Sequence, residues 1–403
     1  MGEDHAARIE ALAALAVDVS ANVADGQTVI VRAHLADAEL VRAVVRAAYR
    51  RGAHQVEVEW NDPLVRRIRL EEAGDAALGW VSPWLHELPT KLGELHGSAI
   101  LLAGDPAPGL YDDIDAERLG RDTVPLPEWG AVIAERLVNW AIVPAPTREW
   151  AGLVHPALDA DAALERLWSQ IEHVCRLDER DPAAAWRARG ADLAGSAERL
   201  TLAQLDSLHF EGEGTDLRVG LLPGVRWMGG GFTTAWGREH LPNIPTEEVF
   251  TSPDPERTEG VVRSTKPLLV DGRAVTGLRM RFEGGRAVEI EADTGAELLR
   301  ELVSRDEGAV RLGEVALVDG SGRIGALDTV FHHTLLDENA ASHVAIGRGF
   351  AFLADDPQSA AAINVSAVHT DFMIGGPGVR VSGRTRDGRD VEVLAEDGTW
   401  RLP

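Results

Sequence analysis

A change in hydrophobic periodicity near residue 203 constrains the fold of this 403-residue chain more than any other feature of the sequence. Before that point, segments with helical apolar spacing alternate with short apolar runs, a pattern typical of a parallel sheet covered by helices. After it, strand-like alternation and frequent glycines indicate antiparallel hairpins. The sequence therefore predicts two domains: an α/β N-terminal domain with a mainly parallel sheet at 1–202, and an α+β C-terminal domain at 203–403.

The predicted elements follow from these patterns. In the N-terminal domain we expect strands at 27–33, 54–60, 98–104 and 138–146, and helices at 5–21, 36–52, 128–137 and about 161–200. In the C-terminal domain we expect hairpins over 207–230, several further strands, and two helices at about 294–305 and 335–348.

Charge and cysteine content limit the possible partners. The chain has 40 Lys and Arg against 65 Asp and Glu, and its net charge of −25 repels phosphate backbones and anionic lipids. We therefore expect neither a nucleic-acid nor a membrane partner. A single cysteine, Cys175, excludes an intrachain disulfide, and its amphipathic surroundings predict a buried thiol. The first 20 residues do not have the pattern of a signal peptide, so a cytoplasmic location is expected.

Histidines and carboxylates in the C-terminal domain have the character of a metal site. Four of the 13 histidines are His332, His333, His343 and His369. In a strand over 364–375, His369 and Asp371 project from the same face, where they can bind one divalent ion or form a surface ion pair. Apolar flanking residues favour the metal site, because a buried strand seldom carries an unpartnered carboxylate.

Other acids occur in similar apolar surroundings. The segment 335–347 has helical periodicity, which places Glu338 and His343 on adjoining faces, although Asp337 and Glu338 also suit the first turn of a helix. Glu314 opens an apolar strand. Glu248 lies between prolines in a segment where Glu247 and Glu248 are expected to point in opposite directions. Such a segment suits a rigid metal ligand as well as an ordinary turn.

The glycine pattern GSGRIG at 320–325 matches a dinucleotide-binding motif. The residues that follow do not have the pattern of the crossover helix that such a site requires, so no dinucleotide site is predicted.

Four segments in order resemble the M29 family of metallo-aminopeptidases: NIPTEEVFTSP, LGEVALVDG, LLDENAASHVAIG and NVSAVHTDFMIG. The resemblance implies a metal-binding C-terminal domain with a dinuclear centre, an activated bridging water and peptide substrates. It also implies two divalent ions (Zn, Co, Mn or Mg) and a homodimer. The implied ligands are Glu248, Glu314, Glu338, His343, His369 and Asp371, with Glu314 bridging.

The resemblance also assigns catalytic positions, and there the chain departs from the family. Glu248 is expected to carry a proton to the leaving amine or to bind metal. The family commonly has a Tyr seven residues after His343, where this chain has Phe350, so one hydrogen-bond donor to the developing oxyanion is lost. His332 and His333 replace a Tyr-Asn pair; His332 can substitute for the missing donor or form part of a surface pair.

Two alternatives remain open from the sequence. A related fold supports a ring-cleaving dioxygenase of dihydroxypyridines with one iron, for which His343, His369 and Asp371 can supply the ligands. A metal-binding homologue without peptidase activity fits the presence of Phe350. The number and kind of bound metal ions would discriminate between these functions.

Overall fold

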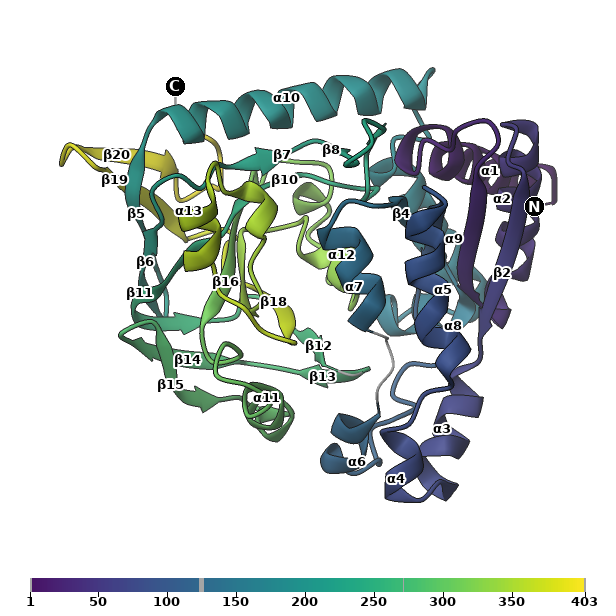
Figure 1. Cartoon of the computed structure of the whole chain (residues 1–403), viewed down its shortest axis with the longest axis horizontal. Helices are drawn as coiled ribbons and strands as arrows, with labels where there is room; N and C mark the ends of the chain where they lie inside the picture. The colour runs from purple at the N-terminus through teal and green to yellow at the C-terminus, as the bar shows by residue number, and fades with distance from the viewer. Residues whose placement is uncertain (1, 123–126, 271, 402–403) are drawn as a thin grey trace. The chain divides into compact units, whose positions relative to one another are not determined.

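The computed structural model describes residues 2–122, 127–270 and 272–401, and Figure 1 shows its helices and strands. The chain forms two compact units, each built from two stretches of sequence. The first unit comprises Met1–Gly190 and Gly231–Thr246, and the second comprises Ala191–Gly230 and Glu247–Pro403. The single boundary at 202/203 expected from the sequence stays a prediction. Among the described residues, no helix is both long and apolar enough to span a bilayer.

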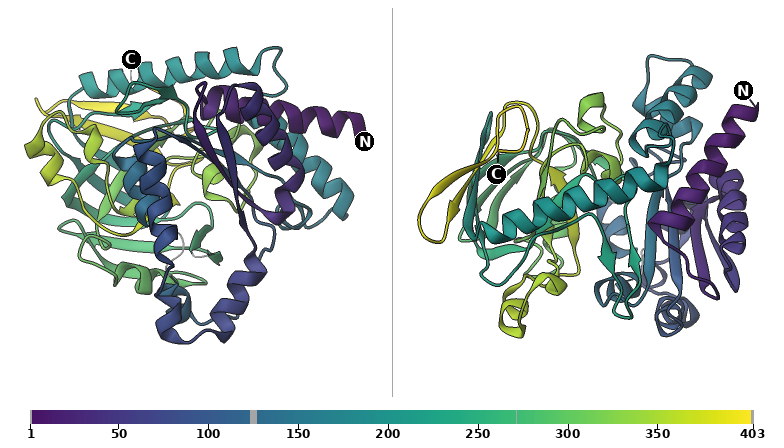
Figure 2. Two further views of the ribbon diagram at one scale, coloured as in Figure 1. Left: turned by 45° about the vertical axis from the view of Figure 1, so that its right-hand side comes forward. Right: turned by 90° about the horizontal axis from the view of Figure 1, so that it is seen from above.

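The first unit contains a four-stranded parallel sheet with the order β2-β1-β3-β4. Its strands are β1 (Thr28–His34), β2 (Gln55–Asn61), β3 (Ser98–Ala103) and β4 (Asn139–Pro144), coloured purple to blue in Figure 2. Three consecutive residues of β1, Val29 to Val31, are buried, which requires that both faces of the sheet are covered. The predicted parallel sheet is therefore confirmed.

Helices connect and cover these strands. They are α1 (Gly2–Leu15), α2 (Ala38–Arg50), α3 (Pro63–Glu72), α4 (Asp75–Leu78), α5 (Pro83–Glu94), α6 (Ala116–Arg121), α7 (Pro127–Ala134), α8 (Arg148–Val154) and α9 (Ala160–Val174). The next helix, α10 (Pro182–Leu202), begins in the first unit and ends in the second. The helix predicted over 161–200 is thus divided into α9 and α10. Pro182 explains the break, because a proline disfavours helical geometry at the residue before it. Cys175, the C-cap residue that follows α9, is fully buried, as the sequence predicts.

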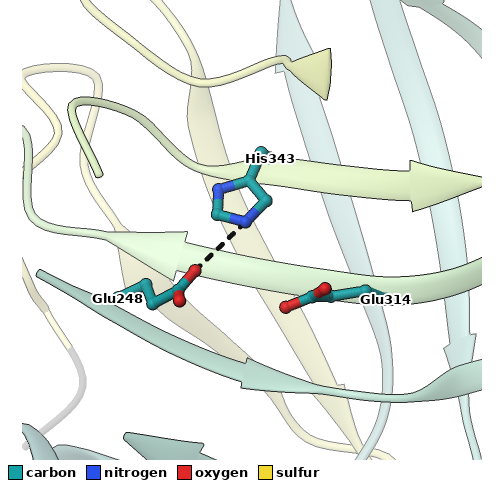
Figure 3. Close-up of side chains that lie close together, drawn as sticks. All are labelled: Glu248, Glu314 and His343. Carbon is teal, nitrogen blue, oxygen red and sulfur yellow. Dashed lines mark ion pairs between the residues drawn. The ribbon is translucent and has the colours of Figure 1, made fainter. Parts of the chain in front are cut away.

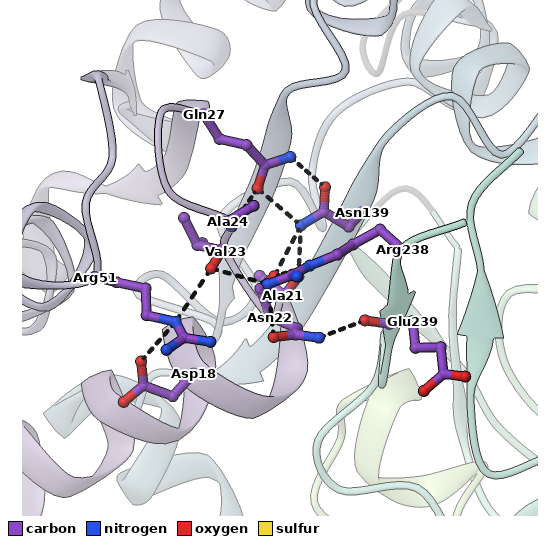
Figure 4. Close-up of polar contacts among 10 residues, drawn as sticks. All are labelled: Asp18, Ala21, Asn22, Val23, Ala24, Gln27, Arg51, Asn139, Arg238 and Glu239. Atoms are coloured by element: carbon purple, nitrogen blue, oxygen red, sulfur yellow. Dashed lines mark hydrogen bonds and ion pairs between the residues drawn. The ribbon is translucent and has the colours of Figure 1, made fainter. Parts of the chain in front are cut away.

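Hydrogen bonds of Arg238 and Glu239 attach residues 231–246 to the rest of the first unit, next to a network of buried amides, as Figure 4 shows. The Asn139 side chain donates to the carbonyl oxygen of Ala21 (2.6 Å) and accepts from the Gln27 amide (2.8 Å). Nearby, Arg238 Nε donates to the carbonyl oxygen of Asn22 at 2.8 Å. Strands β8 (Phe232–Thr233) and β9 (Glu239–His240) form a short hairpin within this segment. The segment that directly precedes Glu247 and Glu248 is therefore fixed by polar contacts inside the first unit.

The second unit is built from antiparallel sheets. A seven-stranded sheet has the order β15-β14-β11-β6-β5-β19-β20, a five-stranded sheet has the order β18-β17-β16-β10-β7, and β12 pairs with β13. The strands are β5 (Leu205–Gly212), β6 (Thr215–Leu221), β7 (Met228–Gly229), β10 (Glu248–Thr251), β11 (Pro253–Arg263), β12 (Leu268–Val270), β13 (Arg273–Val275), β14 (Arg279–Glu283), β15 (Arg286–Glu291), β16 (Leu312–Val318), β17 (His343–Gly347), β18 (His369–Met373), β19 (Arg380–Thr385) and β20 (Asp390–Leu394). The helices are α11 (Ala296–Val303), α12 (Thr334–Asp337) and α13 (Pro357–Ala362). Every residue of β16 is buried, so the five-stranded sheet lies inside the unit.

The helix predicted over 335–348 is wrong. Helix α12 ends at Asp337, and His343–Gly347 form the strand β17, which pairs with β16 on one side and β18 on the other. A short apolar run such as this one fits a buried strand as well as a buried helix by periodicity alone. The β-branched residues Val344 and Ile346 favour the strand, and all five residues of β17 are buried. The other predicted helix, at 294–305, is present as α11.

Candidate metal centre

Strand register places five of the predicted ligands on one face of the five-stranded sheet. Directly paired residues in an antiparallel ladder share a face, and so do residues two apart along a strand. Ala316 pairs with both Phe250 and His343, while Ala345 pairs with both Glu314 and Asp371. The residues that share this face are therefore Glu248, Glu314, His343, His369 and Asp371.

These five side chains form two groups, each of which can hold a metal ion. Glu248, Glu314 and His343 offer ligand atoms within 4.8 Å of one another, and so do Glu314, His369 and Asp371. Figure 3 shows the first group, with His343 and Glu248 directed toward each other and Glu314 on the adjacent strand. His343 Nε2 lies 3.1 Å from Glu248 Oε2, and His369 Nε2 lies 3.2 Å from Glu314 Oε2. Glu314 is common to both groups.

A β-bulge in β16 positions Glu314. The pairing of β16 with β17 shifts between Leu312 and Glu314, and Gly313 occupies the bulge. A Cβ at position 313 would lie 2.2 Å from the carbonyl oxygen of Gly347, so only glycine fits there. Glu314 is the third residue of its strand, not the first as predicted.

Backbone carbonyls orient both imidazoles. His369 Nδ1 donates to the carbonyl oxygen of Arg348 at 2.8 Å, which directs Nε2 toward Glu314 and Asp371. His343 Nδ1 lies 3.3 Å from the carbonyl oxygen of Ala341. Hydrogen bonds of this kind select one tautomer and are common behind metal-binding histidines.

Burial and like charges strongly perturb the carboxylates of this cluster. Burial raises the pKa of Glu314 to about 7, with a further contribution from Asp371. Burial together with the charges of Asp371 and Glu248 raises the pKa of Glu338 well above its usual value. Four carboxylates, two buried and two partly buried, near two imidazoles leave an excess of negative charge when they are ionised, which is unfavourable in a protein interior unless cations compensate for it.

The neighbouring carboxylates favour the charged form of the two histidines and raise their pKa values. Burial disfavours the imidazolium of His343, but the hydrogen bond to Glu248 outweighs it and raises the pKa to about 10. Burial also opposes the charged form of His369, and the neighbouring Asp371 and Glu314 raise its pKa well above the usual value. Burial favours the neutral form of Asp371, but the attraction of His369 outweighs this effect and lowers the pKa of Asp371. Protons on these imidazoles thus occupy the position that a cation would take.

Glu338 lies beside this cluster but belongs to neither group. It follows α12 rather than lying on the helix face expected from the sequence, and its Oε1 accepts a long hydrogen bond of 3.4 Å from Asn339 Nδ2. Asp337 is buried and lies in the single turn that forms α12, so its predicted place in the first turn of a helix is confirmed. Its carboxylate accepts from the N–H groups of Phe331 (3.0 Å) and His333 (3.1 Å), which fixes the turn beside Glu338.

The segment around Glu248 differs from the expectation as well. Glu248 is the first residue of β10 rather than part of a loop, and it is 9% exposed. Glu247 was expected to point to the opposite side, but it is also buried at 1% exposure. The Glu247 N–H donates to Asn339 Oδ1 at 2.7 Å. Asn339, the residue after Glu338, thus holds the residue before Glu248, a role that no pattern in the sequence indicated because Asn339 directly follows two other polar residues.

The remaining predicted residues lie at different places in the second unit. Phe350 packs against the ring of His369, with centroids 5.3 Å apart, so the position of the family Tyr does adjoin the cluster. His332 is half-buried with a φ of 52°; burial lowers its pKa, and its electrostatic partners are Asp337 and Lys266. Lys266 Nζ lies 3.7 Å from Asp337 Oδ1, a contact that the sequence analysis did not anticipate.

The donor set fits divalent ions with borderline character. Imidazole nitrogens and carboxylate oxygens are the ligands that zinc, cobalt and manganese take in proteins. Within the described residues, the two convergent groups of potential ligands both lie on this sheet. Metal binding would remove the repulsion among the buried carboxylates, so the residues present fit the ions that the resemblance implies.

Comparisons with known proteins agree with this site. A family model described as thermophilic metalloprotease (M29) matches residues 5–400. The chain is 41% identical to Aminopeptidase T of Thermus aquaticus, covering 96% of this chain and 97% of that protein. It is 36% identical to Aminopeptidase 2 of Geobacillus stearothermophilus, covering 97% of each. The solved structure of wild-type AmpT from Thermus thermophilus superposes with a TM-score of 0.89 at 38% identity over 98% of each chain.

Proposed function

Since the chain belongs to the thermophilic metalloprotease family M29 and is therefore a hydrolase, we propose that it is a metal-dependent aminopeptidase that releases N-terminal residues from peptides. The observation that carries the proposal is the pair of convergent ligand groups that share Glu314. Relatives named aminopeptidases match the chain over nearly its full length, which supports the same substrate class.

The proposed centre would hold two divalent ions, with Glu314 contributing to both groups of ligands. Glu248 and His343 complete one site, and His369 and Asp371 complete the other. When bound, the ions supply an activated bridging water and polarise the scissile carbonyl. The free α-amine of a peptide is a suitable ligand for such an ion, which accounts for a preference for N-terminal residues.

Two carboxylates receive different proposed roles. Glu248 is assigned as a ligand, because its Oε2 lies 3.1 Å from His343 Nε2 within a convergent group. Glu338, which the resemblance counts among the ligands, lies outside both groups and is assigned as the carrier of the proton that moves to the leaving amine. The position adjacent to His369 holds an apolar ring, Phe350, so this position supplies no hydrogen bond to the developing oxyanion. His332 is the proposed replacement donor.

The function is tested by loading the metal-free protein with zinc, cobalt, manganese or magnesium. The metal content is then measured, followed by hydrolysis of aminoacyl anilides and dipeptides. About two ions per chain and release of the N-terminal residue are expected. Two bound ions without turnover in any metal form would refute the aminopeptidase assignment, and one ion per chain would refute the dinuclear centre.

The roles of the carboxylates are separated by comparing Glu248→Gln with Glu338→Gln. Both substitutions are expected to abolish hydrolysis, but only Glu248→Gln should lower the metal content, because it removes a ligand. Normal metal content in Glu248→Gln, or loss of one ion in Glu338→Gln, would reverse the assignment. His332→Gln is predicted to lower kcat more than it changes KM if His332 acts on the transition state.

The two alternative functions gain no support from the site. A mononuclear iron site would need His343, His369 and Asp371 around one ion, but His343 belongs to one convergent group and the other two residues to the second. An inactive homologue would not require the buried carboxylate excess that the site retains. The homodimer expected from the resemblance is part of the proposal, and sedimentation equilibrium tests it. The cytoplasmic location is also part of the proposal, and cell fractionation tests it.

A further inference from the structure

The carboxyl edge of the parallel sheet in the first unit bears a cavity that the proposed hydrolysis does not use. Its volume is about 740 Å³, within the range of about 300–1,000 Å³ that is usual for small-molecule sites. The lining residues come from the segments that follow all four parallel strands. They include His34 at the end of β1, Asp62 after β2, Pro106 after β3 and Glu149 after β4.

The topology of the sheet marks the same place. The chain passes from β1 through α2 to β2 on one side of β1, and β3 then pairs with β1 on its other side. Between β1 and β3 the strand order therefore reverses its direction. In open parallel sheets, ligands bind outside the carboxyl ends of the strands at such a reversal. Cavity and topology are independent observations, and both locate a binding site at this edge.

The walls of the cavity define the chemistry of the ligand. Most of the lining is apolar and consists of Leu35, Pro63, Leu64, Pro106, Pro108 and Leu153. Leu35 is 55% exposed and Leu64 is 58% exposed, so this surface lies open to a ligand and is not part of a packed core. An apolar body of modest size would bury these side chains.

The charged groups of the cavity are acidic. Among its lining residues, Asp62 and Glu149 supply carboxyl groups, and burial lowers the pKa of His34, which disfavours its cationic form. Asp105 lies close enough to interact electrostatically with His34. These carboxylates exclude phosphates and carboxylic acids and attract cations. The convergent metal-ligand groups found in the described residues lie in the second unit, which argues against a metal ion at this edge.

We propose that this cavity binds a small molecule with an apolar body and one cationic amine. The amine lies among Asp62, Glu149 and His34, and the apolar body packs on Leu35, Leu64 and the prolines. The site is separate in sequence from the metal centre, and its ligand is not consumed there.

The test uses the full chain and three probes that share a phenylethyl body: phenethylamine, phenethyl alcohol and the slightly larger 3-phenylpropionate. Isothermal titration and saturation-transfer NMR measure binding at low and high salt. The amine is expected to bind at least tenfold more tightly than the other two, and to weaken with salt. Equal binding of all three probes would overturn the proposed role of the carboxylates.

Substitutions locate the site. Ala36→Trp fills the cavity from an exposed position and is expected to weaken amine binding at least tenfold. Asp62→Asn keeps the oxygen that caps α3 through the Leu64 N–H but removes the charge, and a loss of roughly fivefold is expected. Glu135→Gln is the matched control, because it removes one exposed charge of the same unit away from the cavity lining.

Glu314→Gln tests whether the amine binds at the metal centre instead of in the cavity. Amine binding that persists in Glu314→Gln and is lost in Ala36→Trp supports the cavity, whatever the outcome of the hydrolysis assays. Binding that is lost in Glu314→Gln and unchanged in Ala36→Trp would overturn it. Self-association that Ala36→Trp abolishes, without binding of the amine, would assign the surface to a second copy of the chain instead.

Discussion

Protonation of His240 is expected to destabilise the first unit in acid. His240 is 6% exposed and lies in the segment that precedes Glu248. Its ring packs near Trp140 (6.2 Å between centroids) and Phe232 (6.0 Å). Burial lowers the pKa of His240 from 6.5 to about 4, against a smaller opposing effect of the Arg238 backbone. The surroundings therefore favour the neutral imidazole.

The magnitude follows from the difference between the folded and unfolded states. A pKa of about 4 against 6.5 is a shift of about 2.5, which corresponds to about 3 kcal/mol at about 1.36 kcal/mol per pKa unit. Because the folded pKa is the lower one, the unfolded chain binds the proton more tightly. The stability from the neutral imidazole is complete above pH 6.5 and is lost as the pH falls toward 4.

Urea unfolding and hydrogen exchange of residues 231–246 would measure this effect between pH 7.5 and pH 4.5. His240→Phe removes the titrating group and keeps an apolar ring, so between pH 7.5 and pH 4.5 its free energy of unfolding should fall by about 2.5 kcal/mol less than that of the wild type. His54→Phe, at an exposed histidine of the same unit, is the matched control and should retain the wild-type pH dependence. If His240→Phe and the wild type lose stability in parallel, the reasoning is refuted.

Three further predictions concern single positions. Phe350→Tyr is expected to raise kcat for aminoacyl anilides up to about 100-fold with little change in KM, because it supplies a hydrogen-bond donor beside His369; unchanged kcat would exclude a catalytic role for this position. Gly313→Ala should displace Glu314, because the new Cβ would lie 2.2 Å from a carbonyl oxygen across the ladder, and metal analysis should then find fewer ions per chain. Asn139→Leu should lower the free energy of unfolding by about 2–3 kcal/mol in urea titrations, because it leaves buried polar groups without their partners; a loss below about 0.5 kcal/mol would contradict this.

The sequence was informative where a local rule determines the geometry. Period-two alternation placed His369 and Asp371 on one face of a strand, and the structure has Nε2 and Oδ1 3.5 Å apart. The apolar surroundings of Glu248 and Glu314 in the sequence indicated that their carboxylates were candidate metal ligands. The helix predicted over 335–348 failed because a short buried run carries no periodic signal that separates the two secondary structures.

By itself, the sequence determined the parallel sheet of the first unit, the family of the chain and the residue types of the metal centre. These features depend on local periodicity, on composition and on motifs within short segments. Only the tertiary structure decided that β17 lies between β16 and β18, and that Glu314 is shared by two ligand groups. Ladder register brings residues more than a hundred positions apart, such as Glu248 and Asp371, to one face of a sheet, and no local pattern specifies that placement.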